Sequence, residues 1–148
     1  MTTDSTRRTH AELLAPETTS LGGWFHIASG YAVEIMGSAG FDWCCIDMQH
    51  GLHSRDTLIP AMQALRAAGC PGIVRVTANS HQQIGLALDA GAQGVVVPQV
   101  SSEEQTRLAV TACRYPPDGR RSWGPVRAKL GPLRPTPGAL DFDARCLA

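Results

Sequence analysis

Short apolar runs alternate along the chain with amphipathic stretches from Leu21 onward. This alternation is typical of βα units that build a parallel sheet. The run from Trp43 to Ile46 is almost wholly apolar, as expected of a strand that is buried on both faces. Four units are predicted, with strands at residues 21–27, 41–47, 72–77 and 94–97 and helices at 31–39, 54–68, 80–90 and 101–114.

Local signals place the ends of these helices. Ser54 is a suitable N-cap for the second helix, and Pro60 either kinks that helix or moves its start. Ser101 and Glu104 have the spacing of a capping box at the start of the fourth helix. The first three helices are expected to end at glycines, namely Gly40, Gly69 and Gly91.

The length of the chain limits the architecture. Its 148 residues suffice for one domain with a core, but a complete (β/α)8 barrel typically needs about 250. We expect a polar N-terminal tail at residues 1–20, a βα domain at 21–124 and a tail rich in proline and arginine at 125–148. No fifth βα unit is visible in this last segment.

The composition of the chain limits the kinds of binding partner and the cellular compartment that we expect. The formal net charge is zero, so the chain lacks the basic excess that favours nucleic acids or anionic membranes. The first 20 residues lack the apolar core of a secretory signal, and no later run is long enough to span a membrane. The five cysteines lack CxxC spacing, so we expect reduced thiols and a cytoplasmic location.

Two residues near the carboxyl ends of strands, His50 and Arg75, are candidates for a functional site. In parallel α/β folds this edge carries the active residues. His50 follows the second strand and is either a general base or an ordinary loop or capping histidine. Arg75 lies in an apolar strand and needs an anionic partner. That partner is either Asp47 on the neighbouring strand, in a structural pair, or a substrate carboxylate or enolate oxygen.

Other polar residues have weaker signals. Arg120 and Arg121 are either solvated loop charges or reach an anion above the barrel, and Asp42 is expected to serve the turn before its strand. Lys129, the single lysine, lies in the C-terminal tail, which argues against a Schiff-base aldolase. Three more histidines lack a metal-ligand pattern such as HExxH and are interpreted as surface or loop residues: His26, His53 and His81.

A succession of short motifs resembles a known family. Together they resemble the class II, pyruvate-dependent aldolases typified by 4-hydroxy-2-oxoheptanedioate aldolase, within the citrate lyase-like family. The resemblance implies a (β/α)8 TIM-barrel fold, of which about the first four βα units are present at residues 21–124. The motifs are LGGW (21–24), AGFDW (39–43), IDMQHG (46–51), VRV (74–76), LDAGA (88–92), GVVVP (94–98) and RYPPDGRR (114–121).

The resemblance also implies an activity and a set of site residues. The expected reaction is cleavage of a 4-hydroxy-2-oxo acid to pyruvate and an aldehyde through a metal-stabilised enolate, in a homo-oligomer. His50 matches the general base, and Arg75 matches the residue that binds the 2-oxo acid and stabilises the enolate. Asp89 matches an aspartate that raises the basicity of the base. Because Asp89 falls at the end of a helix opposite the loops, we expect an adjacent subunit to supply it.

Two departures from the family qualify these expectations. Gln49 stands where the family usually has glutamate beside the base. The family's metal-binding glutamate and aspartate come from later strands, so the expected Mg²⁺, Mn²⁺ or Co²⁺ has no ligand assigned in this chain. The alternative is a truncated or non-catalytic half barrel that is inactive alone or acts only in an assembly. A phosphate-binding barrel has little support, because no glycine-rich phosphate loop is present.

Overall fold

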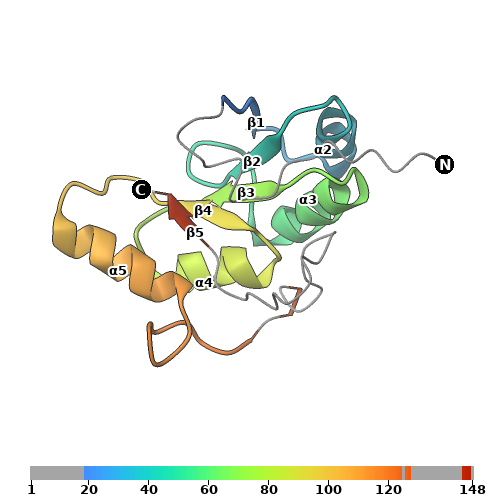
Figure 1. Ribbon diagram of the computed structural model, residues 1–148. Coiled ribbons are helices and arrows are strands. Elements are labelled where there is room, and N and C mark those ends of the chain that lie inside the picture. Colours follow the sequence, from blue (N-terminus) through green and yellow to red (C-terminus); the bar gives the residue numbers. More distant parts are fainter. Residues whose placement is uncertain (1–18, 125, 128–144, 148) are drawn as a thin grey trace.

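A parallel sheet alternates with helices through most of the chain. The computed structural model describes residues 19–124, 126–127 and 145–147. Within them, strands and helices follow one another in the predicted order (Figure 1). The elements are β1 (Gly22–Phe25), α2 (Gly30–Gly37), β2 (Trp43–Asp47), α3 (Arg55–Ala67), β3 (Gly72–Arg75), α4 (His81–Asp89), β4 (Gly94–Val96), α5 (Glu103–Cys113) and β5 (Arg145–Leu147).

All strand pairs in the sheet are parallel, in the order β1-β2-β3-β4-β5. The short strand β5 lies beside β4 although it is distant in sequence (Figure 1). No strand was predicted there, because three residues carry too little alternation to be recognised. β5 therefore extends the sheet beyond the four predicted strands.

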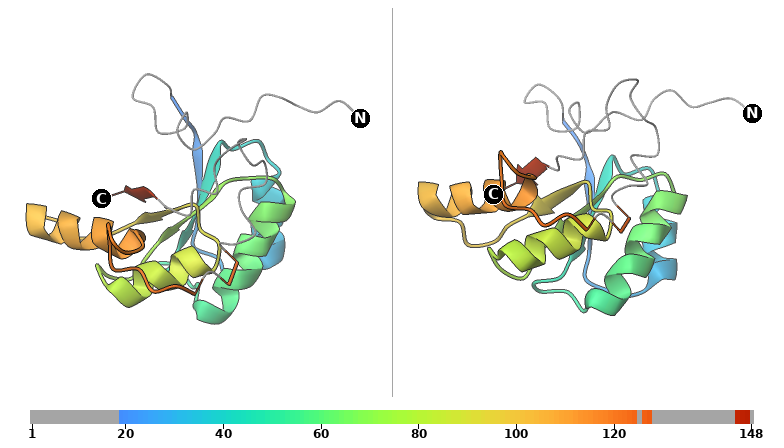
Figure 2. Two further views of the ribbon diagram at one scale, coloured as in Figure 1. Left: turned by 60° about the horizontal axis from the view of Figure 1, so that its bottom comes forward. Right: turned by 90° about the horizontal axis from the view of Figure 1, so that it is seen from below.

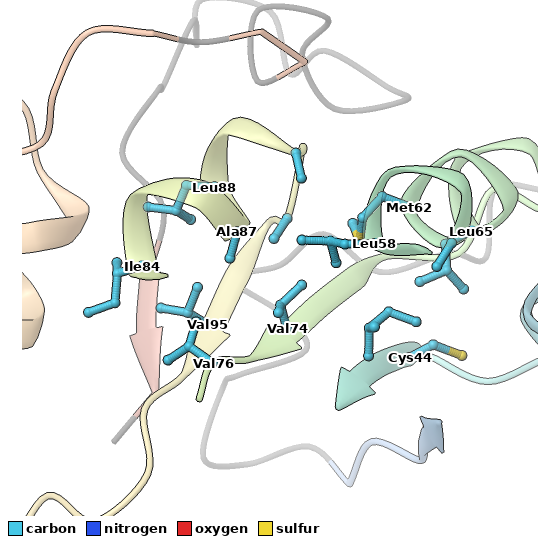
Figure 3. Close-up of a cluster of buried hydrophobic side chains, with 14 of the residues drawn as sticks. Cys44, Leu58, Met62, Leu65, Val74, Val76, Ile84, Ala87, Leu88 and Val95 are labelled. Atoms are coloured by element: carbon cyan, nitrogen blue, oxygen red, sulfur yellow. The ribbon is translucent and has the colours of Figure 1, made fainter. Parts of the chain in front are cut away.

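The helices cover one side of the sheet and create the core. Figure 2 shows α2, α3, α4 and α5 arranged along this side. The core is built from alternate strand residues and from the apolar faces of α3 and α4, including Cys44, Val74, Val95, Leu58 and Leu88 (Figure 3). All of these side chains are at most 1% exposed, so the helices are held to the sheet mainly by apolar burial.

Most helix ends follow the predicted signals, but α2 ends at Gly37, before the predicted end at residue 39. The three glycines predicted to end helices have positive φ angles of 95°, 67° and 98°, at Gly40, Gly69 and Gly91. Ser54 caps α3, with Thr57 completing a capping box. The predicted capping box at Ser101 is wrong by one residue, because the hydroxyl of Ser102 accepts from the backbone of Gln105.

The other face of the sheet presents polar groups at the carboxyl ends of the strands. Side chains on a strand alternate between faces, and the register places Asp47 beside Arg75 and Arg75 beside Val96. Asp47 and Arg75 therefore point to the side away from the helices. Among the described residues, no helix is long and apolar enough to cross a membrane.

Candidate active site at the strand ends

Asp47 is the centre of a hydrogen-bond cluster at this edge. Its side chain is 0% exposed and accepts from six donors. Oδ1 accepts from the backbone nitrogens of Gln49 (2.9 Å) and His50 (3.0 Å) and from Nε of Arg75 (2.9 Å). Oδ2 accepts from Nε1 of Trp24 (3.1 Å) and Nη2 of Arg75 and lies 2.9 Å from Nε2 of His26. The carboxylate thus fixes groups from three different strands and their loops.

The hydrogen bonds keep Asp47 ionised. Burial alone would raise the pKa of this carboxyl, but donation from Arg75, His50, Trp24 and Gln49 holds the pKa well below its usual range. The same interaction raises the pKa of Arg75. Both residues are therefore charged at neutral pH and form an ion pair. Asp47 is the structural partner that was considered for Arg75.

Arg75 is oriented on one side and open on the other. Its guanidinium engages Asp47 through Nε and Nη2 and lies 5.1 Å from the ring centroid of Trp24. Its side chain remains 22% exposed, and no described residue bonds to Nη1. A guanidinium fixed in this way presents a free edge that suits a carboxylate or an enolate oxygen. The pair with Asp47 and a ligand-binding role are therefore compatible.

His50 lies on the loop that follows β2. Its side chain is exposed, whereas its backbone nitrogen is fixed by Asp47. The next residue must be small, since a Cβ built on Gly51 would lie 2.2 Å from the backbone oxygen of Asp47. This tight turn brings the imidazole to the same edge as Arg75. The exposed side chain of His50 and the open edge of Arg75 therefore both lie at the carboxyl ends of the strands.

Two other histidines lie in loops, as predicted, but have surroundings that the sequence did not indicate. His26 is exposed and bonds to Asp47, so sequence reasoning missed its place in the cluster. His53 is buried within its loop, with only 6% of the residue exposed. Burial lowers the pKa of His53, and its Nε2 has no hydrogen-bond partner among the described residues. His81 is exposed at the start of α4, and its Nε2 bonds to the backbone oxygen of Arg120 rather than to Asp47.

Asp89 lies at the opposite end of the fold. It is the last residue of α4, which leads to the start of β4, so it stands at the amino-terminal edge of the sheet. Its Oδ1 accepts from Nη2 of Arg121 at 3.0 Å. Arg121 is buried and lies 4.6 Å from the ring centroid of Tyr115, so the solvated and the barrel-top readings of Arg121 are both wrong. Within one chain, Asp89 and His50 are not brought together.

The described residues do not form a metal site. They contain no group of three or more His, Cys, Asp or Glu side chains that is able to hold a metal ion. The six donors around Asp47 occupy both carboxylate oxygens, and Asp89 is engaged by Arg121. Neither carboxylate therefore fits a divalent cation in this arrangement.

Comparison with known proteins gives the family. The model of the HpcH/HpaI aldolase/citrate lyase family matches residues 21–138. Hydroxypyruvate/pyruvate aldolase of Roseobacter denitrificans is 40% identical over 116 residues, which are 78% of this chain and 45% of the relative. 4-Hydroxy-2-oxo-heptane-1,7-dioate aldolase of Klebsiella pneumoniae is 36% identical over 129 residues, covering 86% and 49%. The chain thus spans about half the length of the curated relatives it matches.

Solved structures agree on the fold. A family protein from Burkholderia cenocepacia superimposes with a TM-score of 0.66 at 34% identity, covering 70% of this chain and 43% of the other. An aldolase from Desulfitobacterium hafniense gives 0.65 at 25% identity, covering 80% and 46%. The predicted fold class is confirmed, as part of a TIM-barrel-like α/β architecture. The chain belongs to the HpcH/HpaI aldolase/citrate lyase family.

Proposed function

We propose that this chain carries part of a carbon–carbon lyase site that cleaves 4-hydroxy-2-oxo acids to pyruvate and an aldehyde. The observation that carries the proposal is the geometry of Arg75. Its guanidinium is held by a fully buried carboxylate, while its outer edge is open at the strand ends. The relatives' names support the reaction class, since hydroxypyruvate/pyruvate aldolase and 2-dehydro-3,6-dideoxy-6-sulfogluconate aldolase of Pseudomonas putida are both aldolases.

In the proposed reaction, Arg75 binds the 2-oxo acid and His50 moves the proton. His50 takes the proton of the C4 hydroxyl, the bond between C3 and C4 breaks, and its electron pair forms the enolate of pyruvate. The charge on the enolate oxygen increases during this step, so a preorganised guanidinium stabilises the transition state more than the ground state. Protonation of the enolate at C3 then gives pyruvate.

The described residues of one chain do not bring the other expected participants to this site. We propose that Asp89 acts on His50 only across an interface between copies in a homo-oligomer. The divalent metal expected from the family resemblance would need ligands beyond the described part of this chain, and no step above depends on it.

An assembly-dependent role is the second candidate. Trp24 lies on the sheet face away from the helices and is 41% exposed, although aromatic side chains of this size are usually covered. A further polypeptide segment over this face would shield Trp24 and complete the site. In this alternative, the chain is inactive alone and becomes active only in the assembly.

Release of pyruvate from a 4-hydroxy-2-oxo acid tests the proposal. We expect NMR to show release by the full chain with Mg²⁺, Mn²⁺ or Co²⁺, and none above background for His50→Ala. His81→Ala is a matched control, because His81 is exposed and bonds to the backbone of Arg120 rather than to Asp47. Equal rates for the wild type and His50→Ala would contradict activity of the chain alone and leave the assembly-dependent role.

A further inference from the structure

A second histidine, His26, lies beside Asp47 at the carboxyl ends of the strands and has no part in the reaction proposed above. His26 directly follows β1, where Phe25 is paired with Ile46, so the next position stands beside Asp47. Its Nε2 is 2.9 Å from Oδ2 of Asp47, and 56% of its side chain is exposed. His26 therefore joins Asp47 and Arg75 in one row across three strands.

His26 is also in contact with the loop that carries His50. The backbone nitrogen of Leu52 donates to the backbone oxygen of His26 at 2.7 Å. A Cβ built on Gly51 would lie 3.1 Å from Cα of His26. The two histidines thus approach the strand ends from adjoining loops, and both are fixed by the carboxylate of Asp47.

The contact with Asp47 determines which nitrogen of His26 is available. An ionised carboxylate only accepts hydrogen bonds, so Nε2 must carry a hydrogen. In the neutral ring the lone pair is then on Nδ1, and no described residue bonds to this atom. A carboxylate that fixes one tautomer and stabilises the protonated ring is a recurrent way to prepare histidine for proton transfer.

We propose that His26 is a second proton-transfer group of this site and contacts the 2-oxo acid through Nδ1. The inference rests on the proposed function. After His50 has taken the hydroxyl proton and the C3–C4 bond has broken, doubly protonated His26 gives its Nδ1 proton to C3 of the enolate. His26 becomes neutral and keeps the hydrogen on Nε2. Water then returns a proton to His26 and accepts one from His50, so protons and charge balance.

A purely structural role for His26 makes a different prediction. If His26 only supplied a donor to Asp47, glutamine would replace it well, because its amide also donates to a carboxylate. Glutamine does not transfer protons at neutral pH. His26→Gln therefore separates hydrogen bonding from proton transfer, and His81→Gln is the matched control.

Two measurements on the full chain test the inference. In nitrogen-15 NMR of labelled histidines, we expect a hydrogen on Nε2 of His26 and a pyruvate-induced shift of its Nδ1. In deuterated buffer, we expect His26→Gln to slow C3 exchange by roughly 100-fold, in the range of general acid–base catalysis. Release of pyruvate from a 4-hydroxy-2-oxo acid should fall less, and His81→Gln should match the wild type in both assays.

The outcomes distinguish this inference from the proposed function. Pyruvate-induced shifts at His50 without any at His26, or wild-type C3 exchange in His26→Gln, would overturn the role of His26 alone. The absence of shifts at both histidines, together with no exchange by the wild type, would overturn the proposed function and this inference with it.

Discussion

Two arginine–aspartate pairs at opposite ends of the fold are built in opposite ways. In the pair at the strand ends, Asp47 is 0% exposed and the side chain of Arg75 is 22% exposed. In the pair at the end of α4, the side chain of Arg121 is 1% exposed and that of Asp89 is 28% exposed. The first pair buries its anion, whereas the second buries its cation.

This difference indicates what each pair is able to do. A buried carboxylate that holds a partly exposed guanidinium leaves a positive edge for an anionic ligand. The second pair has its guanidinium against Tyr115, and the backbone of Arg121 donates to Arg114, so it fastens the segment after α5 to α4. An ion pair alone therefore does not indicate a ligand-binding site. What matters is which of the two residues is exposed, because only an exposed arginine is available to an anionic ligand.

Breaking the first pair should have the largest effect on stability. Asp47→Asn removes the charge that compensates Arg75 and weakens the bonds from Trp24 and His26. We expect the free energy of unfolding to fall by about 3 kcal/mol, as for other buried pairs that lose one partner. Urea denaturation measures this change. As the control, the exposed Asp118→Asn should change the free energy by less than about 0.5 kcal/mol.

The pH dependence gives a second check on Asp47. Because its pKa is lowered in the folded state, its ionised form contributes stability that is complete above the ordinary carboxyl pKa of about 4. This contribution is lost as the pH falls through the folded pKa. The gap between the wild type and Asp47→Asn should therefore narrow below about pH 4, and a constant gap down to pH 2 would contradict the ion pair.

Breaking the pair of Arg121 and Asp89 should lower the free energy of unfolding by a smaller amount. Arg121→Met removes the ion pair and the contact with Tyr115, but the remaining Asp89 is partly exposed and is hydrated. We expect a loss of about 2 kcal/mol in urea denaturation, below the range for fully buried pairs. Equal free energies of unfolding for the wild type and Arg121→Met would contradict a structural role for this pair.

His53 should give the smallest effect. Burial lowers its pKa, so the unfolded chain binds more protons just below the ordinary value of 6.5. Stability should therefore decrease as the pH falls below about 6.5, by at most about 1.4 kcal/mol per pH unit. The decrease should be weaker in His53→Gln. Thermal unfolding between pH 7.5 and 5.5 measures it, and parallel curves would argue against a buried neutral imidazole.

Much of the framework was predictable because it depends on local chemistry. Gly69 and Gly91 directly follow the C-caps of their helices as expected, since a positive φ angle is a local requirement. The register of the buried strands also made the pair of Asp47 and Arg75 a natural candidate. The strand-end rule selected His50 as a candidate from its position alone.

The misses depend on contacts between distant segments. Nothing around Arg121 in the sequence indicates that it returns to α4, 32 residues earlier, and is buried there. His26 had a signal that was not used: it occupies the same face of its strand as Trp24 and continues the row of Asp47 and Arg75. Extending the strand register by one residue would have placed it in the cluster.

The ligand-binding role of Arg75 can be tested by measuring how an Arg75 variant binds pyruvate. Arg75→Lys keeps a positive charge beside Asp47 but loses the planar edge of the guanidinium, so the fold should persist while the ligand contact fails. In calorimetric titrations with Mg²⁺ present, we predict at least about tenfold weaker binding for Arg75→Lys, a loss of about 1.4 kcal/mol. The matched control Arg107→Lys, on the exposed face of α5, should bind as the wild type does. Equal affinities of the wild type and Arg75→Lys for pyruvate would contradict a ligand-binding role for Arg75.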